Sequence, residues 1–270
     1  MKRFNHLLLL SILFLLGTVS TSQAQFLDRL KKQVQRQVEN TVIDKTADKA
    51  AEKTAGAMDK MLSSNPFGPV KGKASPDLIA DTYAFSWKYS LKMTTKQGAM
   101  TINYYLHPDA EYFGFTTETM GDLFTVMDNG RDLIVMFMQS QGNNMVMASQ
   151  MPDEMPGDNK NNDAESFNFE KLPAKTINGY NCKGVKATNA EYEMLMYFTD
   201  EAEVSFDDLY RNQQTKIPPQ LKDYFNEDDK VLMIYMDMNN LKNKKQSAQM
   251  ECIGLDRVSK TIAKSDYNTM

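Results

Sequence analysis

The chain has 270 residues, 20 of them methionine, and its 35 acidic against 31 basic side chains give a net charge of −4. Because nucleic-acid-binding domains concentrate Lys and Arg in a basic stripe, this mild acidity excludes that class of partner. The length is sufficient for one domain with a substantial hydrophobic core, which needs no structural metal to fold.

Residues 1–24 have the pattern of a secretory signal peptide. Lys2 and Arg3 supply the positive charge, Leu7–Leu16 is the apolar stretch, and small residues precede the expected cleavage site before Gln25. The apolar stretch is shorter than the roughly 20 residues that a membrane-spanning helix needs. We therefore expect an exported protein whose mature chain has no transmembrane segment. The periplasm is the favoured destination, and the outer surface and the medium remain open.

The segment 25–62 is predicted to form a charged amphipathic helix, because it is rich in Ala, Lys, Glu and Gln and contains no Pro. Its apolar side chains recur every three or four residues and form a narrow stripe, which consists of Leu27, Leu30, Val34, Val38, Val42, Met58 and Leu62. Either this helix is a solvated element that lies loosely on the domain or projects from it, or residues 26–62 form a coiled-coil or membrane-surface partner segment. Residues 63–80, with their Ser, Asn, Pro and Gly, are predicted to be a linker.

Residues 81–267 are predicted to form an antiparallel β-domain. Between Tyr83 and Met93 every second residue is large and apolar, which is the period of a half-buried strand. Asp128–Gly130 is the strongest hairpin signal in the first half. The strands predicted there are Asp81–Thr94, Ala99–His107, Glu111–Thr117, Leu123–Met127, Asp132–Met138 and Met145–Ser149. Because Asp132–Met138 is apolar on both faces, we expect it to be covered on both sides.

Residues 150–171 interrupt the strand pattern with Pro, Gly, Asp, Glu and Asn, and they are predicted to form a mobile acidic loop. The strands predicted after it are Lys175–Ile177, Tyr180–Thr188, Glu191–Thr199, Val231–Met238 and Ser247–Ile262. Asn178–Gly179 is expected to form a turn and Gly254 a bulge. Ser205–Tyr210 and Gln220–Phe225 are predicted to be short helices that cover the sheet.

These elements predict a mainly β (α+β) fold: a curved antiparallel sheet or half-barrel with short covering helices, preceded by a long N-terminal helix. The segments Asn178–Gly184 and Tyr197–Glu201, followed by two short helices and a long closing strand, resemble an exported bacterial family known as domain of unknown function 4412. The methionine-rich Val135–Met138 and Val146–Ala148 also fit that family. The resemblance covers roughly residues 81–267 and implies an architecture similar to periplasmic lipoprotein carriers. It implies no catalytic residue.

The sequence lacks catalytic and metal-binding motifs. His107, beside Pro108, is the single histidine after export, and the sequence has no GxSxG, HExxH, CxxC or phosphate-loop pattern. The stretch Asn159–Glu170 approximates a calcium loop, but Ala164 stands where that loop needs Gly. We expect no enzyme, metal or cofactor. An unrecognised hydrolase with paired carboxylates is the enzymatic alternative, because such pairs have no fixed spacing.

The two cysteines, Cys182 and Cys252, lie on predicted strands. An even count of cysteines in an exported protein favours a disulfide, and the alternative is two buried free thiols.

The candidate binding surface is apolar. The predicted sheet has more apolar side chains than its short helices can cover, so the surplus is expected to line a groove for an acyl chain or an apolar peptide. Methionine suits such a groove because its side chain adapts to ligands of varied shape. The candidate ligand-binding residues are Trp87, Tyr89, Tyr104, Met136, Met138, Met194 and Met196. We predict a non-enzymatic envelope protein that binds a lipid or a lipidated protein in a concave sheet. The alternative is an assembly module that self-associates through residues 26–62.

Overall fold

The structure is a computed structural model that describes residues 72–108, 110–118, 121–140, 143–151, 167–205 and 230–269. In these ranges the chain forms one twelve-stranded sheet and three short 3-10 helices, η1 (Pro76–Leu78), η6 (Lys244–Gln246) and η7 (Lys264–Asp266). The prediction of a mainly β fold is confirmed. The signal peptide, the predicted helices at 25–62 and Gln220–Phe225, and all of Ser205–Tyr210 except Ser205 lie outside the described residues.

Two meanders make up the sheet. The first contains β1 (Thr82–Thr95), β2 (Gly98–Leu106), β3 (Tyr112–Thr117), β4 (Leu123–Asp128), β5 (Leu133–Ser140) and β6 (Asn143–Gln150). The second contains β7 (Asn168–Ile177), β8 (Tyr180–Thr188), β9 (Tyr192–Thr199), β10 (Leu232–Asn240) and β11 (Ala248–Ala263). The two-residue strand β12 (Asn268–Thr269) completes the order β12-β6-β5-β4-β3-β2-β1-β11-β10-β9-β8-β7. The strand order has two free ends, so the sheet is open. Because β12 pairs with β6 in parallel, the sheet is mixed rather than wholly antiparallel as predicted.

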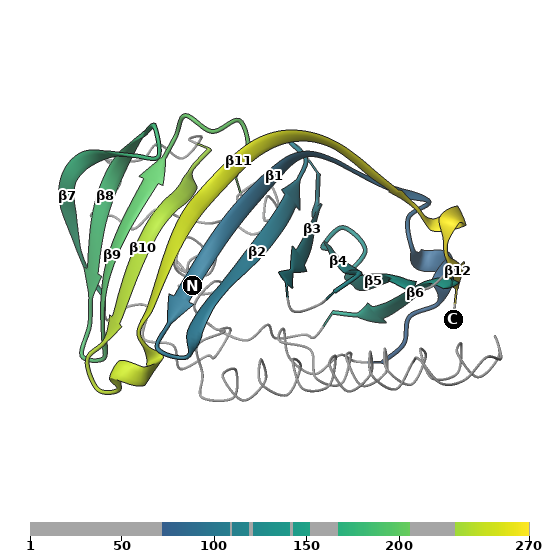
Figure 1. Ribbon diagram of the computed structural model, residues 1–270, viewed down its shortest axis with the longest axis horizontal. Helices are drawn as coiled ribbons and strands as arrows, with labels where there is room; N and C mark the ends of the chain where they lie inside the picture. The colour runs from purple at the N-terminus through teal and green to yellow at the C-terminus, as the bar shows by residue number, and fades with distance from the viewer. Residues whose placement is uncertain are drawn as a thin grey trace, which may run out of the picture.

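The pair of long strands β1 and β11 joins the two meanders and bends over the rest of the first one (Figure 1). Its register shifts twice, between Phe85 and Trp87 and between Ser90 and Leu91. At the second shift Ser90 is opposite Gly254 and Leu91 is opposite Cys252, so that one residue of β11 is left unpaired. Such bulges bend a strand and increase its twist, which explains the curvature of the pair. The bulge predicted at Gly254 is confirmed.

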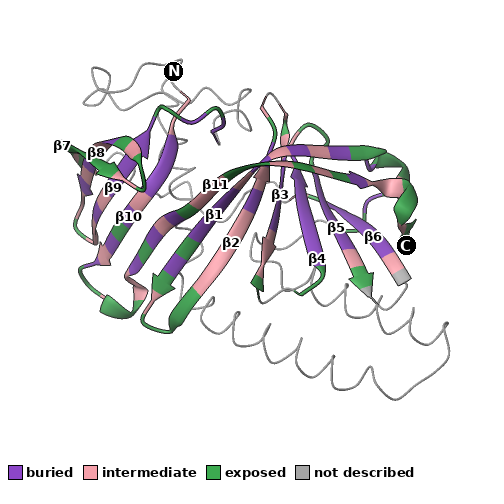
Figure 2. Cartoon of the chain, turned by 45° about the horizontal axis from the view of Figure 1, so that its top comes forward, coloured by how far each residue is buried: buried purple, intermediate pink, exposed green. Residues whose placement is uncertain are grey.

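The sheet has two separate cores. The first core cluster joins β1–β3 to β8–β11, includes Leu91 and Met236, and reaches β4 and β5 through Met127 and Ile134. The second lies between the start of β1 and strands β4–β6 and includes Tyr83 and Phe137. Strand β4 is buried at all six positions, and most of β4–β6 is coloured as buried in Figure 2. On β5, Leu133, Val135 and Phe137 belong to the second cluster and Ile134 between them belongs to the first, as expected for a strand buried on both sides.

The boundaries of the predicted acidic loop are wrong at both ends. Gln150 ends β6, and β7 begins at Asn168, inside the predicted range 150–171. Phe169 and Leu172 pack against the first core cluster, while the residues between them are exposed. Their spacing of three does not follow the period of a strand, so the sequence pattern shows no strand signal here. β7 also contains a proline at 173, which is tolerated because β7 is an edge strand with a register shift at that point.

Candidate functional site

The seven candidate residues predicted from the sequence fall into two groups. Trp87, Tyr89, Tyr104, Met194 and Met196 are all buried in the first core cluster. The other two, Met136 and Met138, lie on β5 and belong to neither cluster of the described residues. The structure therefore does not gather the seven side chains on one wall.

The first group is packed as a protein interior. The Tyr89 hydroxyl donates a hydrogen bond to the carbonyl oxygen of Met233 at 2.7 Å, and its ring stacks on Tyr104 with centroids 6.0 Å apart. Complete burial raises the pKa of Tyr89 well above its ordinary value. The Arg257 guanidinium lies 4.6 Å from the centre of the Trp87 ring. Rings held by such contacts are part of the hydrophobic core, so a surface for ligand binding has to lie elsewhere.

A second apolar surface lies on β4, β5 and β6, and we call it the methionine face. It consists of Leu123, Met136, Met138, Met145 and Met147. The backbone register places Leu123, Met138 and Met145 in one row across the three strands, and Met136 and Met147 in the next row. Side chains at paired positions point to the same side of a sheet, so all five share one face.

The residues of the methionine face are buried or half-buried, but they belong to neither core cluster of the described residues. Met147 is 1% exposed, Leu123 2% and Met136 5%, yet none of the five belongs to a core cluster of the described residues. The opposite side of the same strands, with Val126, Val135 and Val146, packs in the second core cluster. The three strands are thus buried on both sides. The first core cluster reaches the side of the methionine face through Met127 and Ile134, and the five face residues continue that side beyond it.

Two hydroxyl groups lie on the same side as the methionine face. Thr125 pairs with Met136, and Ser149 pairs with Ile134 in the following row. Both hydroxyls are buried and have no hydrogen-bond partner within the described part of the chain. A buried hydroxyl without a partner costs on the order of 1–3 kcal/mol, so these two groups favour a further polar group at the face.

Sequence reasoning found two of the five face residues and missed Leu123, Met145 and Met147. All three lie on predicted strands, and their alternation was visible. The missing step was the hairpin register, because β5 is apolar on both sides and its own pattern does not tell which side faces which core. Counting outward from the β4–β5 and β5–β6 turns would have placed them in rows.

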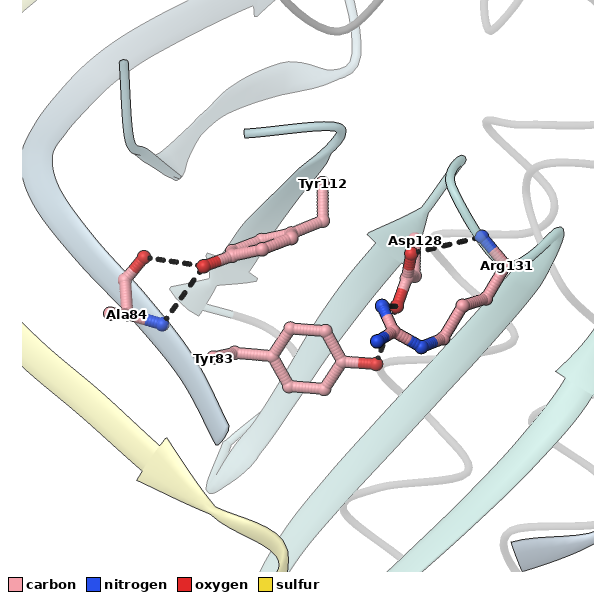
Figure 3. Close-up of polar contacts among 5 residues, drawn as sticks. All are labelled: Tyr83, Ala84, Tyr112, Asp128 and Arg131. Atoms are coloured by element: carbon pink, nitrogen blue, oxygen red, sulfur yellow. Dashed lines mark hydrogen bonds and ion pairs between the residues drawn. The ribbon is translucent and has the colours of Figure 1, made fainter. Parts of the chain in front are cut away.

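Hydrogen bonds of Tyr83 and Tyr112 connect strands around the second core (Figure 3). The Tyr83 hydroxyl donates to the Asp128 carboxylate at 2.8 Å, and Arg131 contacts the same oxygen at 3.3 Å through its side chain. The Tyr112 hydroxyl accepts from the amide of Ala84 and donates to its carbonyl oxygen. Burial, with the nearby Asp128 charge, raises the pKa of Tyr83. These contacts tie β1 to β3 and β4, and we assign them a structural role.

The cysteines are free and buried, so the structure contains the alternative of two free thiols rather than the disulfide that the sequence favoured. Cys182 lies on β8 and Cys252 on β11, with β9 and β10 between them in the strand order. The Cys182 thiol contacts the carbonyl oxygen of Tyr180, and the Cys252 thiol contacts that of Gly254. Burial raises the pKa of Cys182, and it raises that of Cys252 to about 11. Burial thus favours the protonated thiol at both positions.

Among the described residues, no group of three or more His, Cys, Asp or Glu side chains is placed to hold a metal ion. His107 is exposed, and its Nδ1 lies 2.6 Å from the carbonyl oxygen of Pro108. Within the same ranges no helix has the length and apolar character that a membrane crossing requires.

The described part of the chain is thus a β-sheet with a group of apolar side chains, the methionine face, that belongs to neither of its core clusters. A family model described as "Domain of unknown function (DUF4412)" matches residues 85–257. The chain belongs to this family, and the prediction from the motifs at Asn178–Gly184 and Tyr197–Glu201 is confirmed. No curated protein matches the chain.

Similar solved structures share the sheet only distantly. PNGF-II has 12% identity and a TM-score of 0.34 over 70% of this chain and 30% of that chain, so the match spans less than a third of PNGF-II. An uncharacterized conserved protein from Thermus thermophilus has 8% identity and a TM-score of 0.34 over 76% of this chain and 88% of its own. A putative outer membrane lipoprotein-sorting protein domain from Vibrio parahaemolyticus has 9% identity and a TM-score of 0.18, with 64% and 84% covered. None of these likenesses assigns an activity or a ligand to this chain.

Proposed function

We propose that this protein is an exported, non-enzymatic protein that binds a hydrophobic ligand, a lipid or the lipid part of a lipidated protein, on the methionine face. The observation that carries the proposal is the gathering of five apolar side chains, four of them methionine, outside both core clusters of the described residues. Export is supported by the signal-like pattern of residues 1–24.

The chemistry of the face suits an acyl chain. Met138 is the member of the face that is only partly buried, so a ligand gains apolar burial there first. Methionine adapts its shape, which favours a flexible chain over one rigid ligand. The buried hydroxyls of Thr125 and Ser149, which lack partners in the described ranges, support a ligand that also has a polar group, such as an ester or amide.

The test begins with mature protein purified without detergent from an exporting host. We expect its N-terminus at Gln25, lipid in its solvent extract by mass spectrometry, and saturable binding of a fluorescent fatty acid. Met138→Gln combined with Met145→Gln keeps the side-chain volume and should weaken that binding about tenfold, since each change removes roughly 0.8 kcal/mol of apolar contact.

The matched control is Ile253→Gln combined with Leu241→Gln. Both residues are about half exposed on other elements, at 51% and 49%, so their change should leave fatty-acid binding unaltered. Wild-type protein that yields no lipid and ignores the fatty acid would refute the proposed function. Equal loss of binding in the two double variants would place the ligand somewhere other than the methionine face.

A further inference from the structure

We propose that the loop between β10 and β11 is a docking surface for an anionic lipid bilayer, in which Leu241 enters the interface and the neighbouring lysines bind lipid phosphates. The loop comprises residues 241–247 and includes η6. Strands β1–β3 separate it from the methionine face in the strand order. The inference therefore goes beyond the proposed function and concerns a different part of the sheet.

The first observation is an exposed leucine. Leu241 is 49% exposed, and two other large apolar side chains in the described ranges have similar exposure, Leu78 at 50% and Ile253 at 51%. Single exposed apolar residues are common, so their neighbours decide what they indicate. An aspartate precedes Leu78, and a glutamate lies two residues before Ile253. Leu241 differs, because lysine follows it at positions 242, 244 and 245.

Lysines from two neighbouring connections form a basic patch at this end of the sheet. Thr95 at the end of β1 pairs with Ala248 at the start of β11, so the β1–β2 turn lies beside the β10–β11 loop (Figure 1). That turn contains Lys96. The patch consists of four exposed lysines, Lys96, Lys242, Lys244 and Lys245.

The charge of the patch is only partly neutralised. The Glu191 carboxylate lies 3.7 Å from the Lys242 ammonium group, and the Glu193 carboxylate binds Lys186 instead. The other three lysines of the patch form no ion pair within the described part of the chain. This local positive charge, in a chain of net charge −4, is complementary to an anionic membrane surface, where each lysine strengthens binding about fivefold.

Hydrogen bonds hold the loop in shape. Asn240 is fully buried, and its side-chain oxygen accepts hydrogen bonds from the amides of Lys242 and Asn243 at 2.9 Å and 2.7 Å. The Leu241 amide donates to the carbonyl oxygen of Glu191 at 2.8 Å. These bonds fix the backbone in a conformation that leaves the Leu241 side chain exposed. A surface that is ordered before binding loses little conformational entropy when it binds.

The combination of leucine and lysine favours a bilayer over a soluble polyanion. Lysine side chains reach phosphate groups while their alkyl stems stay near the apolar boundary of the bilayer, and a leucine among them gains by leaving water for that boundary. A soluble polyanion would bind the lysines and leave Leu241 in water. The loop therefore has the chemistry of a surface that docks on lipid.

The test is co-sedimentation of the full mature chain with vesicles of phosphatidylcholine, alone or mixed with phosphatidylglycerol. We expect binding to the mixed vesicles, none to phosphatidylcholine alone, and loss of binding at about 0.5 M salt, where charges are screened within a few ångströms. Lys244→Gln combined with Lys245→Gln should weaken binding about twentyfold, and Leu241→Gln should weaken it about fivefold.

Matched controls make the same kinds of change elsewhere. Lys175→Gln combined with Lys183→Gln removes the same charge near the β7–β8 turn, at the opposite end of β8. Ile253→Gln removes an apolar side chain of similar exposure that has an acidic neighbour. Both controls should bind the mixed vesicles as the wild type does.

Wild-type protein that sediments with neither kind of vesicle, or equally with both, would overturn the proposal. Loss of binding in the lysine variant without any loss in Leu241→Gln would overturn it in favour of a soluble polyanion as partner. Equal loss in the Lys175→Gln/Lys183→Gln control would also overturn it, because net charge rather than the loop would then explain binding. Leu241→Gln should retain fatty-acid binding, and Met138→Gln/Met145→Gln should retain vesicle binding, so this inference and the proposed function can fail separately.

Discussion

Gly114 shows how closely two aromatic layers approach in the second core. A Cβ atom at this position of β3 would lie 2.3 Å from the Phe124 ring and 3.1 Å from the Phe85 ring. Phe124 has little room to move, because it also contacts Tyr105 at a centroid distance of 5.1 Å. The backbone conformation of Gly114 is one that any residue adopts, so backbone strain does not require glycine here. The lack of space for a side chain does.

We therefore predict that Gly114→Ala lowers the free energy of unfolding by about 2–3 kcal/mol, the usual penalty for overpacking a core. The measurement is urea denaturation followed by tryptophan fluorescence. Gly254→Ala is the control, because its added Cβ would meet nothing nearer than 3.4 Å, and it should change stability by no more than about 0.5 kcal/mol. Equal stability of the two variants would show that the ring of Phe124 gives way freely.

The Tyr83–Asp128 contact is the second residue-scale prediction. Asp128 is 1% exposed, and it accepts hydrogen bonds from the Tyr83 hydroxyl and from Arg131. Tyr83→Phe removes one of these donors from a buried carboxylate, which should cost about 1.5–3 kcal/mol in unfolding free energy. Tyr105→Phe is the control, since no hydrogen bond of that hydroxyl occurs in the described ranges, and thermal unfolding should distinguish the two. Matched losses in both variants would contradict the role given to Asp128.

At the scale of elements, the sequence predicts a strand or a turn correctly where the residues that define it lie close together in the chain. The alternation between Tyr83 and Met93 predicts β1, and Asn178–Gly179 predicts the β7–β8 turn, where φ angles of 51° and 87° fit a type I′ hairpin. The double-sided apolar pattern of 132–138 predicts a strand buried on both faces. Each of these signals depends on residues within a few positions of one another.

Elements that depend on distant partners could not be predicted in the same way. β12 is two residues long and exists because it pairs with β6, more than a hundred residues earlier in the chain. The start of β7 is defined by the contact of Phe169 with a core built from other strands. The candidate site was half predicted for this reason: Met136 and Met138 lie on one predicted strand, whereas the rows that include Leu123 and Met145 arise from register between strands.

At the scale of the whole molecule, β6 is the point where both ends of the described chain meet. Residues 72–74 pair with its second half, and β12 pairs with Met145 and Val146. Since β11 continues through η7 into β12, the middle strand of the sheet is covalently tied to this edge. The outer edge of β6 is therefore covered, which removes a row of free backbone groups that would otherwise invite pairing with another chain.

Two separate cores connected by β1 and β11 suggest that the two halves of the sheet open with different free energies. Tyr267 belongs to the second half: its ring lies 4.9 Å from that of Phe137, and its hydroxyl accepts from Gln139 at 3.1 Å. Tyr235 is its counterpart on β10, where its ring lies 6.3 Å from Tyr197 and its hydroxyl accepts from Gln249 at 2.9 Å. Each tyrosine is partly buried and joins elements of one half.

We predict that Tyr267→Ala destabilises the β5–β6–β12 edge by about 2 kcal/mol, so amide hydrogen exchange there accelerates roughly thirtyfold, while β8–β10 exchange at wild-type rates. Tyr235→Ala should produce the reverse distribution, with faster exchange in β9–β11 and none of the effect at β6. Native-state hydrogen exchange with mass spectrometry resolves both regions in one experiment. If either variant accelerated exchange evenly across the sheet, the two cores would be one cooperative unit, and a ligand at the methionine face would then stabilise the whole molecule rather than its nearer half.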